Sequence, residues 1–192
     1  MKKSIKISLF GIVLMLSAVS QTSCAEGFSL IKSELPNKYS AIALQSAEAD
    51  KLTKVQIFED QIFNLRLDHQ QIGTLVSGRG IENVDGRENS TCFIVFQKSD
   101  GQSELLKTVG HGDWEAETCI NVKSIGMIHS KKSTSPAIAI VYEAASPNTA
   151  VLEPVVFHFS DKEFKLTIDE LNTKKASLAG ATTIKNIRTI LK

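Results

Sequence analysis

The second half of the chain alternates between short β-forming segments and turns, and this rhythm constrains the fold more than any other feature. Residues 91–97 (TCFIVFQ) combine β-branched and aromatic side chains, and a Ser-Asp-Gly turn follows them. Residues 103–109 supply a hairpin partner for that segment. Further segments of this kind occupy residues 117–129, 137–142, 155–159 and 164–168. The spacing predicts a mainly β fold, an antiparallel meander arranged as a sandwich, a barrel or a small propeller-like array.

Two segments indicate how the predicted sheet is covered. Residues 137–142 (AIAIVY) are continuously apolar, which is typical of a central strand buried on both faces. Residues 181–191 place Ile184, Ile187 and Ile190 on one face of a short C-terminal helix. We expect this amphipathic helix to pack on an open face or an edge of the sheet.

Residues 40–68 carry conflicting periodicities. The alanines of the segment YSAIAL favour a helix at its start. Residues 54–68 show apolar spacings of three and four, which suit a helix, and an alternation from Phe63 to Leu67, which suits a strand. We predict strands there, with a turn at Glu59-Asp60-Gln61; a helical 40–68 region would make the fold α+β. The glycine-rich residues 77–80 and 85–87 are predicted to form a loop.

Residues 1–25 have the features of a bacterial secretory signal peptide. Three lysines precede an apolar run that is too short for a membrane span, which needs about 20 residues. Small residues at the −3 and −1 positions predict cleavage before Glu26. Residues 26–192 are then expected to form a single globular domain, located in the periplasm or secreted.

Cys24 gives the same region a second interpretation. Its surroundings resemble the lipobox of bacterial lipoproteins, in which the cysteine carries the lipid. Gln21 stands where a lipobox has leucine or a similar apolar residue, so the sequence departs from that pattern. The alternative is a lipid anchor at Cys24.

Cleavage before Glu26 would leave two cysteines, Cys92 and Cys119. In an oxidising compartment such a pair normally forms a disulfide. In the chain-entropy model this bridge contributes about 3 kcal/mol to stability. No Cys-x-x-Cys spacing indicates a redox function.

The charge of the predicted mature chain is close to neutral. The full chain has 22 basic and 21 acidic residues; residues 1–25 hold three of the former and none of the latter, which leaves 19 and 21. A chain with this balance has no overall attraction for nucleic acids or anionic membranes. No second apolar segment approaches the length of a membrane span.

The segment GHGDWE is the strongest candidate for a binding loop. It holds the only tryptophan, Trp114, together with His111, Asp113 and Glu115. Loops held by a rigid sheet often carry recognition, and tryptophan is enriched among interface anchors. We predict a recognition loop; the alternative is a turn whose Trp114 folds back over the core beside Cys119.

The same segment also raises the question of a metal site. His111, Asp113 and Glu115, joined by His129 or His158, are residue types that bind zinc. Zinc requires three or four such ligands in tight geometry, and this short pattern arises easily by chance. The sequence therefore predicts no metal ion and no other cofactor.

A second polar loop covers residues 129–136 (HSKKSTSP). It is basic and rich in hydroxyl groups, which suits contact with an acidic partner. Its expected contact residues are Lys131, Lys132 and Ser133.

No catalytic motif accompanies these loops. The sequence lacks a Gly-x-Ser-x-Gly elbow, a P-loop and a dinucleotide fingerprint. Our leading hypothesis is an exported bacterial envelope protein that acts by protein–protein binding, for example a periplasmic inhibitor or immunity-type protein that blocks a toxic hydrolase. The alternatives are a small periplasmic hydrolase or metal-dependent enzyme that uses His111 and Asp113, and a passive envelope lipoprotein.

Overall fold

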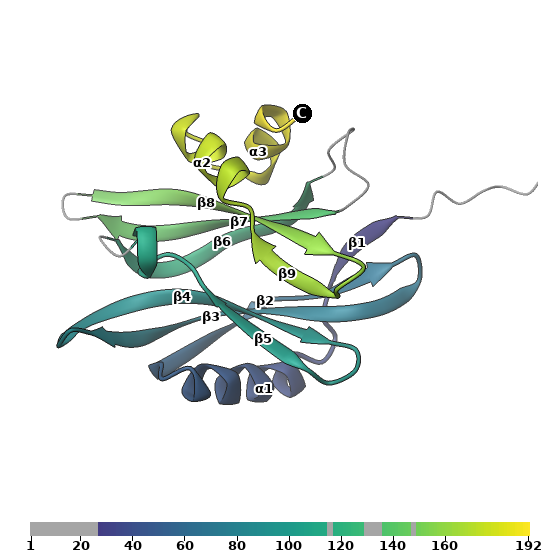
Figure 1. Cartoon of the computed structure of the whole chain (residues 1–192), viewed down its shortest axis with the longest axis horizontal. Coiled ribbons are helices and arrows are strands. Elements are labelled where there is room, and N and C mark those ends of the chain that lie inside the picture. The colour runs from purple at the N-terminus through teal and green to yellow at the C-terminus, as the bar shows by residue number, and fades with distance from the viewer. Residues whose placement is uncertain (1–26, 115–116, 129–135, 147–148) are drawn as a thin grey trace, which may run out of the picture.

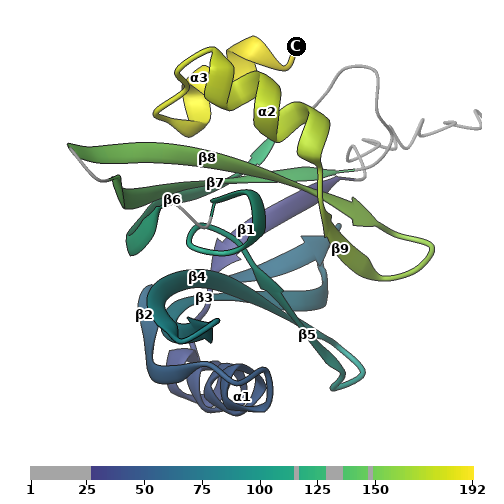
Figure 2. The same cartoon turned by 60° about the vertical axis from the view of Figure 1, so that its left-hand side comes forward.

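The computed structural model describes residues 27–114, 117–128, 136–146 and 149–192. Two antiparallel sheets pack face to face, and helices cover both outer faces (Figures 1 and 2). Strands hold 57% of the described residues, and no closed barrel forms among them. The predicted mainly β fold with a C-terminal helix is therefore confirmed, in the form of a sandwich. The predicted signal peptide and Cys24 lie outside the described residues.

The first sheet has the strand order β1-β2-β3-β4-β5, and α1 lies across its outer face (Figure 1). Its elements are β1 (Phe28–Lys32), α1 (Pro36–Ala49), β2 (Thr53–Leu67), β3 (Gln70–Val84), β4 (Arg87–Lys98) and β5 (Ser103–Lys107).

The second sheet has the order β6-β7-β8-β9, and α2 and α3 cover its outer face (Figure 2). A short 3₁₀ turn, η1 (Gly112–Trp114), lies in the connection between the sheets. The elements after it are β6 (Thr118–Ile128), β7 (Ala137–Ser146), β8 (Thr149–Ser160), β9 (Lys165–Ile168), α2 (Glu170–Leu178) and α3 (Ile184–Ile190).

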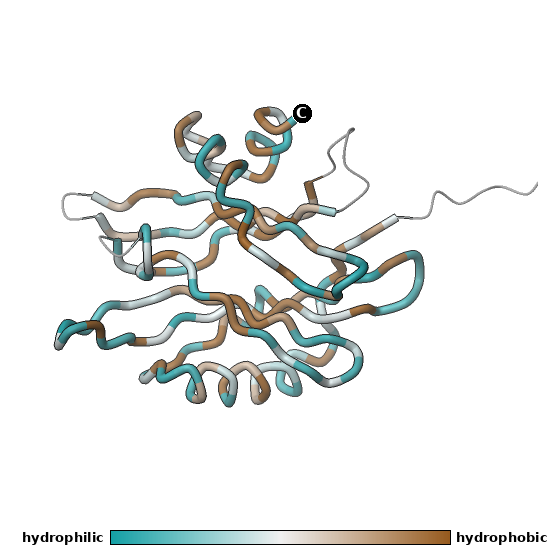
Figure 3. Tube along the Cα trace, in the orientation of Figure 1, coloured by the Kyte–Doolittle hydropathy of each residue, from teal (hydrophilic) through white to brown (hydrophobic). Residues whose placement is uncertain are grey.

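The largest core lies between the sheets and takes side chains from both. Strand β7 shows how alternation builds the layers: Ile138 and Ile140 face this core, whereas Ala139 and Val141 face α2 and α3. All four are fully buried, so the prediction of a central strand buried on both faces is confirmed. Figure 3 shows the same arrangement, with apolar residues along the strands and hydrophilic residues at the hairpin tips.

The β3–β4 hairpin is the most regular part of the first sheet. Its two turn residues, Asp85 and Gly86, both have positive φ angles (52° and 79°), as a type I′ turn requires. Twelve residue pairs align the strands without a register shift. The rings of Phe96 and Phe93 lie against Gly73 and Gly78, where a methyl group would overlap them.

Two sequence predictions in the first sheet are wrong. Residues 77–80 lie inside β3 rather than in a loop, because glycine there makes room for neighbouring side chains rather than for a turn. Residues 59–61 do not reverse the chain, since β2 runs through them. Glu59 and Asp60 instead lie where the β2–β3 register shifts between Ile57 and Ile62, as at a β-bulge.

The helices are partly as expected. The alanines do form a helix, α1, which begins with Pro36 and buries Ala43 and Ala47 fully against the sheet. Helix α3 buries Ile187 and packs on the face of β6 and β7. Helix α2 was not predicted from the sequence.

Candidate functional site

The connection between β5 and β6 carries residues of the predicted recognition loop from the first sheet to the second. The backbone NH of His111 donates to the carbonyl of Thr108 (3.0 Å), and that of Trp114 donates to His111 (3.1 Å). The NH of Gly110 closes the turn by donating to the carbonyl of Trp114 (3.1 Å). The loop is therefore a compact, internally hydrogen-bonded turn.

Strand β4 holds the base of this loop. The side-chain amide of Asn89 donates to the carbonyl groups of Gly110 (3.0 Å) and Glu117 (3.1 Å). The hydroxyl of Thr91 donates to the same Gly110 carbonyl (3.1 Å). Gly110 has a φ of 92° and lies against the carbonyl of Ser90, so a side chain there would clash with the backbone.

A disulfide fixes the exit of the loop. Cys92 of β4 and Cys119 of β6 are bonded, as predicted, with their Cα atoms 5.3 Å apart. The bridge connects the two sheets and closes a loop over a sequence separation of 27 residues. In the chain-entropy model such a bridge stabilises the fold by about 3–4 kcal/mol.

Trp114 anchors the loop rather than projecting from it. Its side chain is partly buried and packs against the core cluster that contains Cys119. The exposed tip is formed by His111, Gly112 and Asp113. A partner would therefore meet the histidine and the aspartate first, on a base fixed by the tryptophan.

An ion-pair cluster (the Glu82 cluster: Asp50, Glu82, Lys107 and His111) supports the same loop. The carboxylate of Glu82 lies 2.9 Å from Nζ of Lys107 and 2.8 Å from Nδ1 of His111. Lys107 also contacts a carboxylate oxygen of Asp50, the residue that ends α1, at 2.8 Å. The side chains of Glu82 and Lys107 are only 13% and 15% exposed, so solvent screens this pair weakly.

The cluster changes the protonation of its members. Burial works to raise the pKa of Glu82, but hydrogen bonds and charge from Lys107 and His111 outweigh it and lower the pKa. Burial works to lower the pKa of Lys107, and its contacts with Asp50 and Glu82 raise it instead. Both groups are therefore held in their charged forms.

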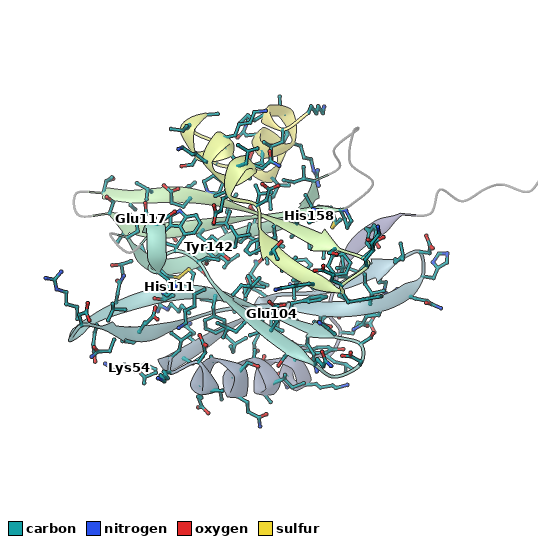
Figure 4. All side chains as sticks on the ribbon, in the orientation of Figure 1. Lys54, Glu104, His111, Glu117, Tyr142 and His158 are labelled. Atoms are coloured by element: carbon teal, nitrogen blue, oxygen red, sulfur yellow. A yellow bond between two sulfur atoms is a disulfide. The ribbon has the colours of Figure 1, made fainter. Side chains whose placement is uncertain are left out.

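A groove of about 360 Å³ adjoins the exit of the loop at Thr118 and Cys119. Its cationic lining comes from Lys54 and Arg79. The guanidinium of Arg79 donates to the side chain of Gln56 (3.0 Å) and to the carbonyl of Ile120 (3.0 Å), which joins the sheets again. Lys54 and His111 both lie at this end of the sandwich (Figure 4).

Glu117, which no sequence motif singles out, lies at the same end (Figure 4). Burial, with a smaller contribution from the charge of Glu153, raises its pKa to about 7. One of its carboxylate oxygens is buried and has no hydrogen-bond partner among the described residues. Glu153 accepts a hydrogen bond from Ser177 (3.3 Å), and burial raises its pKa as well.

The described residues do not assemble the considered metal site. Nδ1 of His111 is directed at Glu82, and His158 lies toward the other end of the sandwich (Figure 4). No three His, Cys, Asp or Glu side chains of the described chain gather closely enough to hold a metal ion. The structure does not describe Glu115, His129, Lys131, Lys132 and Ser133.

Comparisons with known proteins add no assignment. Neither the protein-family models, nor the curated proteins, nor the solved structures gave a match to this chain. Within the part of the chain that the structure describes, no helix has both the length and the apolarity needed to cross a membrane.

Proposed function

We propose that this chain is an exported bacterial envelope protein that acts by binding another protein. The contact surface would be the end of the sandwich formed by the loop tip (His111, Gly112 and Asp113) and the neighbouring groove at Arg79. The cross-sheet disulfide is compatible with export, and residues 1–25 have the pattern of a signal peptide.

The observation that carries this proposal is the set of contacts that hold the loop below its exposed tip. Backbone hydrogen bonds, two β4 side chains, the disulfide and the Glu82 cluster all hold residues whose tip remains exposed. A loop that is already ordered loses little conformational entropy on binding, so more of the contact energy contributes to affinity.

The loop and the groove together suit a partner whose surface carries both acidic and basic groups. Asp113 presents an acid, while Arg79 has no carboxylate partner among the residues the structure describes. Arginine at such a position can bind a carboxylate of the partner with two hydrogen bonds. An exposed loop tip beside a cationic groove is consistent with an inhibitor or immunity-type protein that blocks the cleft of a hydrolase.

Affinity capture from the bacterial envelope tests the contact surface. The tagged protein is compared with Asp113→Arg, which reverses the charge at the loop tip, and with Asp161→Arg at the exposed β8–β9 turn as a control. We expect one stoichiometric partner with the wild type and the control, and its loss with Asp113→Arg. A partner that all three proteins retain equally, or the absence of any partner, would contradict the proposal.

Mass spectrometry of the mature N-terminus separately tests where the protein is located. A chain that starts at Glu26 supports a periplasmic or secreted protein. A chain that starts at lipidated Cys24 would replace that assignment with an envelope lipoprotein.

A further inference from the structure

Two hollows meet at Tyr39, near the N-terminal end of α1. The smaller measures about 160 Å³ and the larger about 350 Å³. Tyr39 and Gln71 line both, and we call the two together the Tyr39 groove. Their combined size is in the range of pockets that hold small molecules.

A hydrogen-bonded network forms the wall between the hollows. The amide nitrogen of Gln71 donates to the hydroxyl groups of Tyr39 (3.0 Å) and Thr74 (2.9 Å). Thr74 in turn donates to the side-chain oxygen of Asn64 (3.0 Å). Thr74 and Asn64 are almost completely buried, at 1% and 8% exposure, so the network is fixed within the protein.

Two further polar groups at the groove lack partners. Nε of Arg66, which lines the smaller hollow, is buried and has no hydrogen-bond partner among the described residues. The side-chain oxygen of Gln97, which lines the larger hollow, is in the same state. Buried polar groups in native proteins are nearly always paired, so these two need an explanation.

The charge of the lining indicates the kind of ligand. The lining of the two hollows contains four cations and one acid, Glu34. None of the four forms an ion pair within the described chain. The first turn of α1 adds positive potential, because it contains no acid and its N-cap, Leu35, offers no side-chain acceptor. The four cations are Lys32, Lys38, Arg66 and Lys98.

We propose that the Tyr39 groove binds a small organic anion through a carboxylate or phosphate group. Arg66 is the residue that pairs with the anionic group, since its guanidinium is the unpaired cation with a buried donor. Tyr39 and Gln71 contact the polar remainder of the ligand. This binding is a second function, independent of the protein contact at the opposite end of α1.

NMR titration of the purified protein tests the site with the two smallest probes, inorganic phosphate and acetate. Sodium chloride at the same ionic strength is the control for screening. We expect saturable shifts of the Tyr39 and Gln71 signals with at least one probe and none with chloride. The probe that saturates at lower concentration identifies the anionic group.

Three variants assign the contact. Arg66→Gln should weaken binding about ten-fold, because it removes a charged hydrogen bond. Lys38→Gln, at an exposed position that tolerates change, should weaken it about three-fold through lost charge alone. Arg87→Gln, at the exposed turn of the β3–β4 hairpin, is the matched control and should leave binding unchanged. No saturable shift with either probe, or equal affinity in all variants, would overturn the proposal.

Discussion

The two ends of helix α1 differ in how the basic side chains beside them are paired. At its C-terminal end, Asp50 contacts Lys107, which also pairs with Glu82. Near its N-terminal end, Arg66 and Gln97 each bury a polar atom that has no partner among the described residues. Paired groups stabilise a fold, whereas unpaired ones cost stability until a ligand satisfies them. The ion pairs at the first end therefore hold a loop in place, whereas the unpaired groups at the second end are the basis for the anion site proposed above.

Removal of the disulfide should destabilise the end of the molecule that carries the Glu82 cluster more than any other change. The double variant Cys92→Ala/Cys119→Ala should lower the free energy of unfolding by about 3–4 kcal/mol and Tm by about 10 °C. Urea denaturation and a thermal scan of both proteins measure this. A loss below about 1 kcal/mol would mean that the core between the sheets and the hydrogen bonds hold them together without the disulfide.

Removal of Lys107 tests the Glu82 cluster. Lys107→Met leaves Glu82 largely buried without its main partner and should cost about 2 kcal/mol. The matched control is Lys54→Met, because Lys54 and its partner Glu88 are 70% and 61% exposed and such pairs contribute at most about 1 kcal/mol. Urea denaturation compares the two variants. Equal losses would show that burial adds nothing to this cluster.

Glu117 makes the same end sensitive to pH. Its pKa rises from an ordinary 4.5 to about 7, so the folded protein binds this proton more tightly than the unfolded chain does. Stability from this group should be fully present below pH 4.5, fall as the pH rises to about 7, and stay constant above that.

Glu117→Gln should remove this dependence and raise Tm at pH 8 by about 2–4 °C, with little change at pH 4.5. Glu163→Gln, in the exposed turn before β9, is the control and should leave the profile unchanged. Thermal scans between pH 4.5 and 8 measure both. An unchanged profile in Glu117→Gln would assign the pH dependence to other groups.

Loss of a charge at the Tyr39 groove should change the stability of the fold least. Arg66→Gln removes a buried donor that has no hydrogen-bond partner in the described chain, so the free energy of unfolding should not fall and should rise by up to about 1 kcal/mol. Chemical denaturation without added anions measures this. A large loss would show that Arg66 supports the fold, and would weaken its assignment to ligand binding.

Local patterns predicted the second half of the chain well. Strands β4 to β9 follow from β-branched segments and turn residues that lie next to each other in sequence. Helix α2 could have been found by its local signals too, since Asp169 caps its first turn and Gly180 follows its end with a φ of 65°.

The features that could not be predicted depend on residues distant in sequence. In the sequence Gly78 indicates a turn, and only the structure shows that it leaves room for the ring of Phe93 on the neighbouring strand. The members of the Glu82 cluster come from α1, β3, β5 and the following loop, and no spacing in the sequence connects them. The Tyr39 groove likewise combines α1, four strands (β1 to β4) and the β4–β5 turn.

The β3–β4 hairpin has a consequence for how the molecule forms. Its turn needs two residues, and its pairing joins positions close in sequence, so it can assemble before any contact between the two sheets. A slip of one residue would move side chains that face the main core, such as Ile94 and Phe96, to the opposite face of the sheet, so the aligned form is strongly preferred. The hairpin can therefore act as a nucleus that orients Cys92 early, while the strand that carries Cys119 is still being recruited. Oxidation of Cys92 and Cys119 to the disulfide would then lock strands that had already paired in the correct register.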